Sequence, residues 1–185
     1  MKRKIFTALL VSSMLFVAAC GSDKKNVELK NTTTFEQTGY TIDLPDTWTR
    51  TANSNTDLTF YYASSKNNEF TENITTMVQD LSTYDYTLES YKDLSISSYE
   101  DMGYKVDECK KSTVDKQDCY IVTSTAEGND SKIYCKQMFV LKDRNAYLFT
   151  FAAEKDDYKA LSDEVDAIFA TVKFNDKVMT ASEVE

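Results

Sequence analysis

Histidine is absent from the 185-residue sequence, and it holds only four glycines and one proline. Without histidine the chain has no Ser-His-Asp or Cys-His catalytic arrangement, and it lacks the commonest metal ligand in proteins. The glycines are too few and too far apart for a phosphate-binding loop or a dinucleotide-binding fingerprint. The sequence therefore predicts no metal site and no cofactor, and it argues against an enzyme.

The N-terminus combines a basic start, Lys2-Arg3-Lys4, with an apolar run from Ile5 to Ala19. This order is typical of a secretory signal peptide. A membrane-spanning helix needs about 20 apolar residues, so this shorter run is not predicted to cross a bilayer. We interpret residues 1–19 as a signal peptide that is removed on export.

The apolar run ends in VAACG at residues 17–21, which resembles the lipobox of bacterial lipoproteins. The resemblance implies that the Cys20 sulfur carries diacylglycerol and that the chain is cut just before Cys20. Two acyl chains anchor a protein stably, whereas one gives only marginal membrane binding. The alternative is an ordinary secretory peptide cut after Ala19. We favour the lipoprotein, which predicts a protein anchored on the extracytoplasmic face of the cell membrane.

Acidic residues outnumber basic residues by 30 to 21, so the whole chain has a formal net charge of −9. Residues 1–19 contain basic residues but no acidic ones, and their removal leaves −12. Nucleic acids and anionic lipid surfaces attract clustered lysines and arginines. The charge therefore argues against a nucleic-acid partner and predicts that the domain hangs from its lipid without lying on the headgroups.

Residues 20–34 are polar and unpatterned, which predicts a flexible spacer after the lipid. We expect one folded domain over residues 35–175 and a polar tail that frays over residues 176–185. Helical periodicity appears between Thr87 and Met102, with Thr87 as the N-cap and Gly103 just past the end. A second helix is predicted after Glu154, with one apolar stripe formed by Tyr158, Leu161, Val165, Ile168 and Phe169.

The remaining segments alternate as strands do. Strands are expected around Gly39, at 58–62 and 74–78, in a meander over 104–112, 118–125, 131–141 and 146–152, and at 171–174. Apolar residues on both faces of the last meander strand predict a sheet that is covered on both sides. The predicted fold class is α+β, an antiparallel meander sheet flanked by helices.

The motif GYTIDLPDTW at 39–48, followed by a helix, a meander, YLFTFAAE at 147–154 and TVKF at 171–174, resembles the PsbP-like superfamily. The resemblance covers about residues 35–175. It implies an α/β/α sandwich that serves as a docking or scaffolding module and not as an enzyme. It transfers no functional residue, because the partner surfaces of this family differ from member to member. Pro45 and Trp48 match the pattern and are interpreted as turn and core residues.

Three cysteines remain in the domain, Cys109, Cys119 and Cys135, and disulfides can form outside the cytoplasm. If the loop after Thr125 is centred on Glu127, Cys119 faces Cys135. If the preceding loop is centred on Val114, Cys109 faces Cys119 instead. We predict a Cys119–Cys135 bridge, with three free thiols as an equal alternative. A catalytic thiol is disfavoured, because acidic neighbours raise thiol pKa values.

Tyrosine is abundant, with 12 residues, and most are interpreted as packing residues of strands and helices. Tyr84 and Tyr86, in the loop before the first helix, are the candidates for an exposed recognition surface. The sequence predicts a membrane-anchored binding or scaffolding module with a protein partner. The alternative is a small-ligand or ion binder with a tyrosine-lined cleft between sheet and helix. A hydrolase or thiol enzyme is the least favoured.

Overall fold

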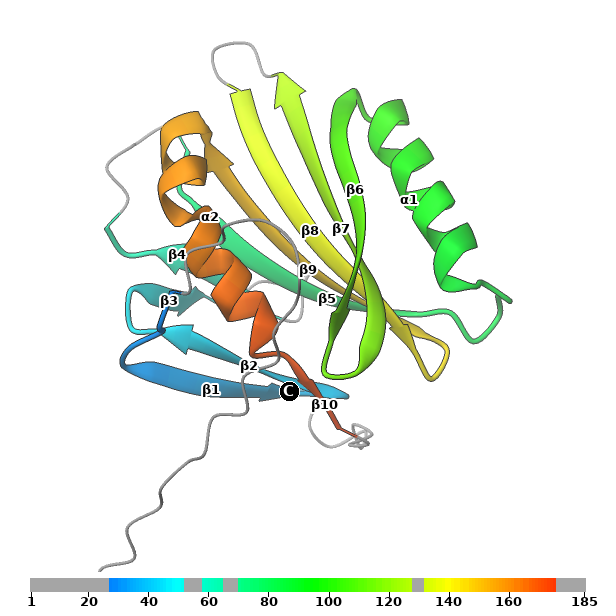
Figure 1. Ribbon diagram of the computed structural model, residues 1–185, viewed down its shortest axis with the longest axis horizontal. Coiled ribbons are helices and arrows are strands. Elements are labelled where there is room, and N and C mark those ends of the chain that lie inside the picture. The colour runs from blue at the N-terminus through cyan, green and yellow to red at the C-terminus, as the bar shows by residue number, and fades with distance from the viewer. Residues whose placement is uncertain (1–26, 52–57, 65–69, 128–131, 176–185) are drawn as a thin grey trace, which may run out of the picture.

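The computed structural model describes residues 27–51, 58–64, 70–127 and 132–175. The predicted signal peptide, Cys20 and the whole of the predicted tail lie outside these residues. Within them the chain forms a large sheet, a small sheet and two helices (Figure 1). This arrangement confirms the predicted α+β class.

The large sheet is antiparallel throughout, with the strand order β3-β4-β5-β9-β8-β7-β6. Its strands are β3 (Trp48–Thr51), β4 (Leu58–Tyr62), β5 (Asn73–Asp80), β6 (Tyr104–Val114), β7 (Gln117–Glu127), β8 (Lys132–Lys142) and β9 (Asn145–Glu154). The last four form the predicted meander, which confirms that part of the sequence interpretation.

Two hairpin turns of the meander contain only two residues each. Asp115 and Lys116 join β6 to β7 with φ angles of 45° and 65°, and Asp143 and Arg144 join β8 to β9 with 51° and 61°. Positive φ at both central residues is the hallmark of the type I′ turn, whose twist matches that of the flanking strands. Because turn length fixes strand register, these turns decide which residues face each other across the sheet.

The small sheet has the order β1-β2-β10, formed by β1 (Thr32–Gln37), β2 (Tyr40–Pro45) and β10 (Lys173–Phe174). A separate sheet was not predicted from the sequence. β1 begins at Thr32, within the predicted spacer, and not at Phe35. Gly39 turns the chain between β1 and β2 with a φ of 80°. A Cβ atom there would lie 2.3 Å from the Tyr147 hydroxyl, so the position needs glycine.

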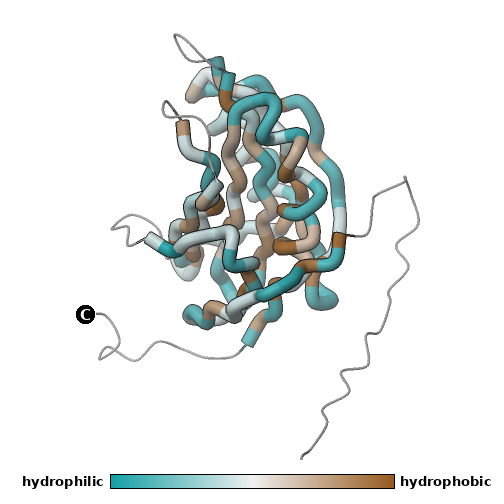
Figure 2. Tube along the Cα trace, turned by 90° about the vertical axis from the view of Figure 1, so that its left-hand side faces the viewer, coloured by the Kyte–Doolittle hydropathy of each residue, from teal (hydrophilic) through white to brown (hydrophobic). Residues whose placement is uncertain are grey.

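The small sheet and α2 (Lys155–Ala170) cover one face of the large sheet, and we call this side the α2 face. Hydrophobic and hydrophilic residues alternate along the strands, as Figure 2 shows. The buried side chains of the α2 face include Tyr40, Ile42, Trp48, Phe60, Phe149, Phe151, Val165, Ile168 and Phe169. The main core of the molecule therefore lies between α2, the small sheet and this face.

The opposite face of the large sheet carries α1 (Leu88–Asp101), and we call it the α1 face. Its core is smaller and consists of Leu81, Tyr91, Val122, Phe139 and Ala146. Thr87 caps α1 and Gly103 follows it with a φ of 84°, as predicted from the sequence. The sheet is thus covered on both sides, which confirms the predicted sandwich, but the two covers differ in extent.

Candidate functional site

A cleft of about 390 Å³ lies between α1 and the α1 face of the large sheet. Its lining consists of Gln79, Tyr84, Tyr86, Tyr91, Leu94, Ser95, Ser98, Tyr99, Met102, Gln137 and Leu148. None of these side chains is charged, although 28% of the residues of the chain are charged. The cleft therefore offers aromatic rings, aliphatic groups and neutral hydrogen-bonding groups to a ligand.

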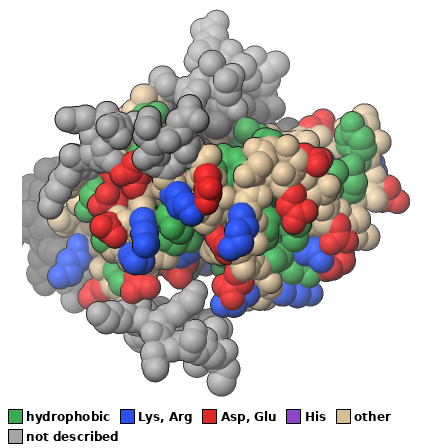
Figure 3. All heavy atoms as spheres, turned by 90° about the horizontal axis from the view of Figure 1, so that it is seen from above, with side chains coloured by type: hydrophobic (Ala, Val, Ile, Leu, Met, Phe, Trp, Pro, Cys, Tyr) green, Lys and Arg blue, Asp and Glu red, His purple; other side chains and the backbone are tan. Residues whose placement is uncertain are grey.

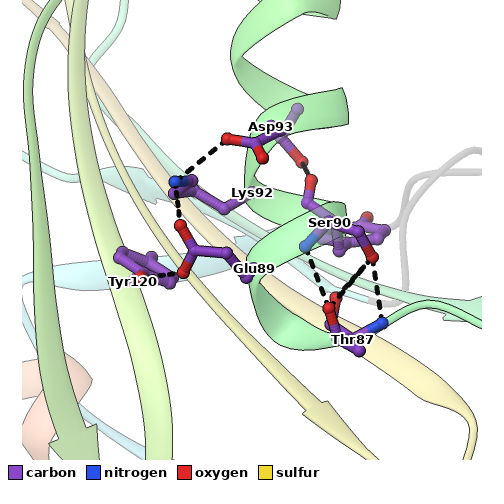
Figure 4. Close-up of polar contacts among 8 residues, drawn as sticks. Thr87, Glu89, Ser90, Lys92, Asp93 and Tyr120 are labelled. Atoms are coloured by element: carbon purple, nitrogen blue, oxygen red, sulfur yellow. Dashed lines mark hydrogen bonds and ion pairs between the residues drawn. The ribbon is translucent and has the colours of Figure 1, made fainter.

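The N-terminal end of α1 is fixed by polar contacts, which Figure 4 shows. The Ser90 amide donates to Thr87 Oγ1 at 3.1 Å, and the Thr87 amide donates to Ser90 Oγ at 3.0 Å. These reciprocal bonds form a capping box, which satisfies amides that the helix leaves unpaired. The helix therefore has a defined start next to the cleft.

Glu89 and Lys92 attach this end of α1 to strand β7 (Figure 4). The Tyr120 hydroxyl donates to Glu89 Oε2, and Lys92 pairs with Glu89. The Lys92 ammonium also lies 5.5 Å from the centre of the Tyr120 ring, within range of a cation–π contact. The hydrogen bond from Lys92 is the largest of the effects that lower the pKa of Glu89.

The C-terminal end of α1 is held more weakly. Tyr91 is the only residue of α1 that is buried, whereas Leu94 and Met102 are 45% and 64% exposed. The last turn contains Glu100 and Asp101 and no basic residue. Acidic groups at a helix C-terminus oppose the helix dipole, so this turn is locally unfavourable. One wall of the cleft is therefore a helix that polar contacts hold at its N-terminal end, whereas its C-terminal end is held by the packing of Tyr99 against Tyr104.

The two tyrosines singled out from the sequence, Tyr84 and Tyr86, both line the cleft. Their rings stack at 5.4 Å with an interplanar angle of 24°, and Tyr86 meets Tyr91 edge-on at 6.0 Å. Tyr84 is 55% exposed. The Arg144 guanidinium donates to the backbone carbonyls of Ser82 and Tyr84 and so fixes their loop. Tyr84 is therefore exposed and Tyr86 is partly buried, and their role as a recognition surface stays a prediction.

Other cleft residues carry hydrogen-bonding groups that the sequence analysis did not identify. The Tyr91 hydroxyl donates to Gln79 Oε1 at 2.9 Å, and Gln137 Nε2 donates to Thr150 Oγ1 at 2.8 Å. Burial is the largest of the effects that raise the pKa of the Tyr99 hydroxyl, which holds this group in its neutral form. These residues come from β5, β8, β9 and α1, so only the folded chain brings them together.

The predicted Cys119–Cys135 bridge is wrong, because Cys109, Cys119 and Cys135 are all free thiols. Cys119 lies opposite Val140, and Cys135 lies opposite Ser124. The two cysteines are therefore offset along the strands by about 17 Å at roughly 3.4 Å per residue. A disulfide needs Cα atoms within about 6.8 Å.

The cysteines also point to different faces of the sheet. Cys119 packs in the core of the α2 face. Cys135 alternates with Phe139 along β8 and so points to the α1 face, where Cys109 is partly buried. The alternative Cys109–Cys119 pairing fails as well, because the two-residue turn places Ser112 opposite Cys119. Burial raises the pKa of Cys119 and of Cys135 to about 11, which argues against reactive thiolates.

Charged side chains gather in another part of the described chain. A shallow hollow at the end of β6, β7 and β8 contains ion pairs between Lys105 and Asp107 and between Glu127 and Lys132. Across residues 27–51, 58–64, 70–127 and 132–175, no group of His, Cys, Asp or Glu side chains is arranged to hold a metal ion. On the face that Figure 3 shows, acidic and basic side chains are mixed and form no continuous basic patch.

No helix in the described part of the chain is long and apolar enough to cross a membrane. A comparison with models of protein families found no match. A comparison with curated protein sequences found none either.

Solved structures do resemble the chain. LpqN of Mycobacterium tuberculosis, described as involved in cell envelope biogenesis, matches with a TM-score of 0.64 and 12% identity over 78% of this chain and 90% of LpqN. The cyanobacterial PsbP protein CyanoP of Synechocystis matches with a TM-score of 0.58 and 13% identity over 85% of this chain and 98% of CyanoP. At these identities the likeness concerns the fold alone. The chain has the PsbP-like fold, an antiparallel seven-stranded sheet with a small second sheet and two helices.

Proposed function

We propose that this protein is a lipid-anchored, extracytoplasmic binding module, not an enzyme, that holds a partner protein in the cleft beside α1. The observation that carries the proposal is the uncharged, tyrosine-rich lining of a cleft in a strongly acidic chain. Aromatic residues and methionine are enriched at the centres of protein interfaces, whereas Lys, Glu and Asp are depleted there. The composition of the cleft follows that preference.

The distribution of exposed apolar side chains supports the same surface. The large hydrophobic residues with the greatest exposure are Tyr61, Met77, Tyr84, Leu94 and Met102. The last three line the cleft, and Met77 lies opposite the cleft residue Leu148 on the neighbouring strand. Tyr61 lies on the neighbouring strand β4, where it pairs with Asn73 of β5. Asn73 and Met77 are four residues apart on β5, so Tyr61 points to the same face of the sheet as Met77. Exposed apolar groups that gather on one side mark interaction surfaces.

The proposed anchor places this surface away from the membrane. Diacylglycerol on Cys20 would tether the domain through residues 20–31, which reach at most about 40 Å at roughly 3.4 Å per residue. Figure 1 shows β1 and α1 on opposite sides of the molecule. A domain tethered through β1 therefore presents α1 and its cleft to partners beyond the bilayer surface.

A small uncharged ligand in the same cleft is the second candidate. Its volume of about 390 Å³ lies within the range of roughly 300–1,000 Å³ that is typical of small-molecule sites. The two candidates differ in the surface that they cover. A small ligand in the cleft would leave Tyr61 and Met77 exposed to solvent, whereas a protein partner would cover them. Hydrogen exchange of β4 and β5 in the bound state therefore separates the two candidates.

The binding function is tested by changing one cleft residue and a matched residue of the other helix. Leu94→Glu places a charge in the cleft, and Ala160→Glu places the same charge on the exposed side of α2. We expect the partner to co-purify from detergent-solubilised membranes with wild-type protein and with Ala160→Glu, but not with Leu94→Glu. Equal recovery with all proteins would rule out the cleft.

The anchor is tested separately by the intact mass of the protein extracted from membranes of its host. We expect the mass of residues 20–185 plus a diacylglyceryl group, and we expect Cys20→Ala to abolish both the cleavage and the modification. An unmodified chain recovered from the medium would contradict the anchor without bearing on the cleft.

A further inference from the structure

The large sheet ends in two edge strands of different length (Figure 1). β3, at one end, has four residues, whereas β6, at the other end, has 11. In the part of the chain that the structure describes, no strand pairs with the outer edge of β6. Folded proteins usually keep edge strands short, because the unpaired N–H and C=O groups of a long edge can bind another strand. β6 therefore offers a place where a further strand can be added.

The turn between β6 and β7 fixes which backbone groups of β6 face outward. Val114 and Gln117 flank a two-residue turn and therefore exchange hydrogen bonds with each other. Bonded and non-bonded pairs alternate along an antiparallel ladder, so every second residue from Val114 back to Glu108 bonds to β7. The residues between them direct their N–H and C=O groups to the free edge, and they are Cys109, Lys111 and Thr113.

Residues 108–114 follow the bulge of β6 and form a regular edge that is open to solvent on both faces of the sheet. Lys110 lies opposite Ile121 of the α2 face, and Glu108, two residues away, shares this face. The side chains of Glu108 and Lys110 are 50% and 67% exposed, and that of Lys111 on the other face is 60% exposed. Side chains from another strand can therefore reach them.

The charges along this edge are complementary to themselves. Residues 107–111 read Asp-Glu-Cys-Lys-Lys, with acids before Cys109 and bases after it. In an antiparallel pair of two β6 strands centred on Cys109, Glu108 lies opposite Lys110 of the partner subunit, and the same contact recurs across the axis. Opposite charges that face each other on one side of a sheet stabilise the strand pair. A centre on Glu108, Lys110 or Lys111 would oppose like charges instead.

We propose that two copies of this protein pair antiparallel through β6, centred on Cys109, and so join their large sheets into one. Each lysine at position 110 already lies 2.7 Å from Glu108 of its own chain, so pairing creates a network of four alternating charges. A two-fold axis relates the copies, which closes the assembly as a dimer. The cleft is not part of this contact, because its strand residues come from β5, β8 and β9.

Cys109 supplies a direct test, because its thiol would lie next to Cys109 of the partner subunit. Residues in a hydrogen-bonded antiparallel pair have Cα atoms about 5.5 Å apart. We expect a short bis-maleimide, which joins two thiols through two thioether bonds, to convert the full protein in host membranes to a covalent dimer. Cys109→Ser should remain monomeric. Failure of the wild type to cross-link, or equal cross-linking of Cys109→Ser, would overturn the proposal.

Charge reversal tests the register of the pair. Lys110→Glu opposes glutamates on both sides of the axis, so we expect it to weaken the dimer about tenfold in sedimentation equilibrium of the full protein in detergent. Glu108→Lys/Lys110→Glu exchanges the two charges and should recover the wild-type affinity. Lys159→Glu makes the same charge change at an exposed site on α2 and should have no effect. A double variant as weak as Lys110→Glu would contradict the register, and a wild type that is monomeric at every concentration would overturn the dimer.

Discussion

The two helices cover opposite faces of the same sheet but are held in different ways. α2 buries Leu161, Val165, Ile168 and Phe169, whereas α1 buries only Tyr91. Buried apolar contacts set the free energy needed to open an element locally. α2 therefore belongs to the stable scaffold, and α1 is a weakly held wall that can adjust to a ligand.

The polar contacts of the two helices differ in the same way. Lys136 is almost fully buried under α2, and its ammonium donates to Ser162 Oγ at 2.6 Å and to Asp166 at 2.7 Å. The Trp48 indole donates to Glu164 of α2 at 2.8 Å. The contacts of α1 with Tyr120 are exposed and lie at one end of the helix. A binding surface on a rigid scaffold with one adaptable wall is the arrangement that the proposed function requires.

The largest effect is expected from truncating the scaffold helix. Ile168→Ala should lower the free energy of unfolding by about 2–5 kcal/mol, because it leaves a cavity under α2. Leu94→Ala, at a half-exposed position in the lining of the cleft, should change it by less than about 0.5 kcal/mol. Urea unfolding of both variants measures the difference. Similar losses would contradict the contrast between the helices.

A smaller change in the free energy of unfolding, with the opposite sign, is expected for a substitution of Glu72 on the α2 side of the molecule. Its side chain is fully buried, and neither carboxylate oxygen has a hydrogen-bond partner among the residues that the structure describes. Glu72 and Glu164 both act on the Tyr62 hydroxyl, whose pKa is raised mainly by burial and then by these acids. A glutamine amide cannot ionise and therefore costs less to bury than a carboxyl without partners, so Glu72→Gln should raise the unfolding free energy by about 1 kcal/mol.

The control for Glu72→Gln is Glu28→Gln, the same change at an exposed position. It should leave the urea midpoint unchanged. A loss of stability in Glu72→Gln would show that the carboxylate has a role that its surroundings do not reveal.

Loss of the α1 cap should act locally. Thr87→Ala removes the hydroxyl that accepts from the Ser90 amide and should cost about 1 kcal/mol. Because α1 is weakly held, we expect faster amide exchange over residues 88–101 and unchanged exchange over α2. Uniformly faster exchange in both helices would mean that α1 opens only with the whole domain.

The smallest expected effect is a difference in reactivity among the three thiols, which lie on both faces of the large sheet. Burial raises the pKa of all three thiols, to about 11 for Cys119 and Cys135, but Cys109 alone is only partly buried. Alkylation requires the thiolate, so at pH 8 Cys109 should react first, and the other two should react only as the pH approaches 11 or on unfolding. Peptide mapping after iodoacetamide treatment measures this order. Early labelling of Cys119 would contradict the packing of the α2 face.

The sequence predicted the elements whose signals are local. The periodicity and caps of α1, the apolar stripe of α2 and the alternation of the meander all lie within short segments. The small sheet was missed because β10 has two residues and β1 lies in the polar segment TTTFEQ. The disulfide prediction failed because register depends on the position of the turn. Glu127 pairs with Lys132, so the chain does not reverse around Glu127 as the predicted bridge required.

The candidate site was predictable only in part. Tyr84 and Tyr86 lie in a polar loop next to a helix start, which marked them as exposed. Gln137 and Tyr99 looked like ordinary strand and helix residues, because their meeting in the cleft depends on where α1 packs. A tyrosine-lined cleft between helix and sheet is present as predicted, but its uncharged lining became visible only in the folded chain.

The most direct test of the account places a photo-crosslinking residue, p-benzoylphenylalanine, at Met102 in the cleft or at Ala160 on α2. Irradiation of host membranes should give a discrete cross-linked partner from position 102 and none from position 160. Adducts from position 160 alone would contradict the account, because they would place the binding surface on the face that we assign to the scaffold.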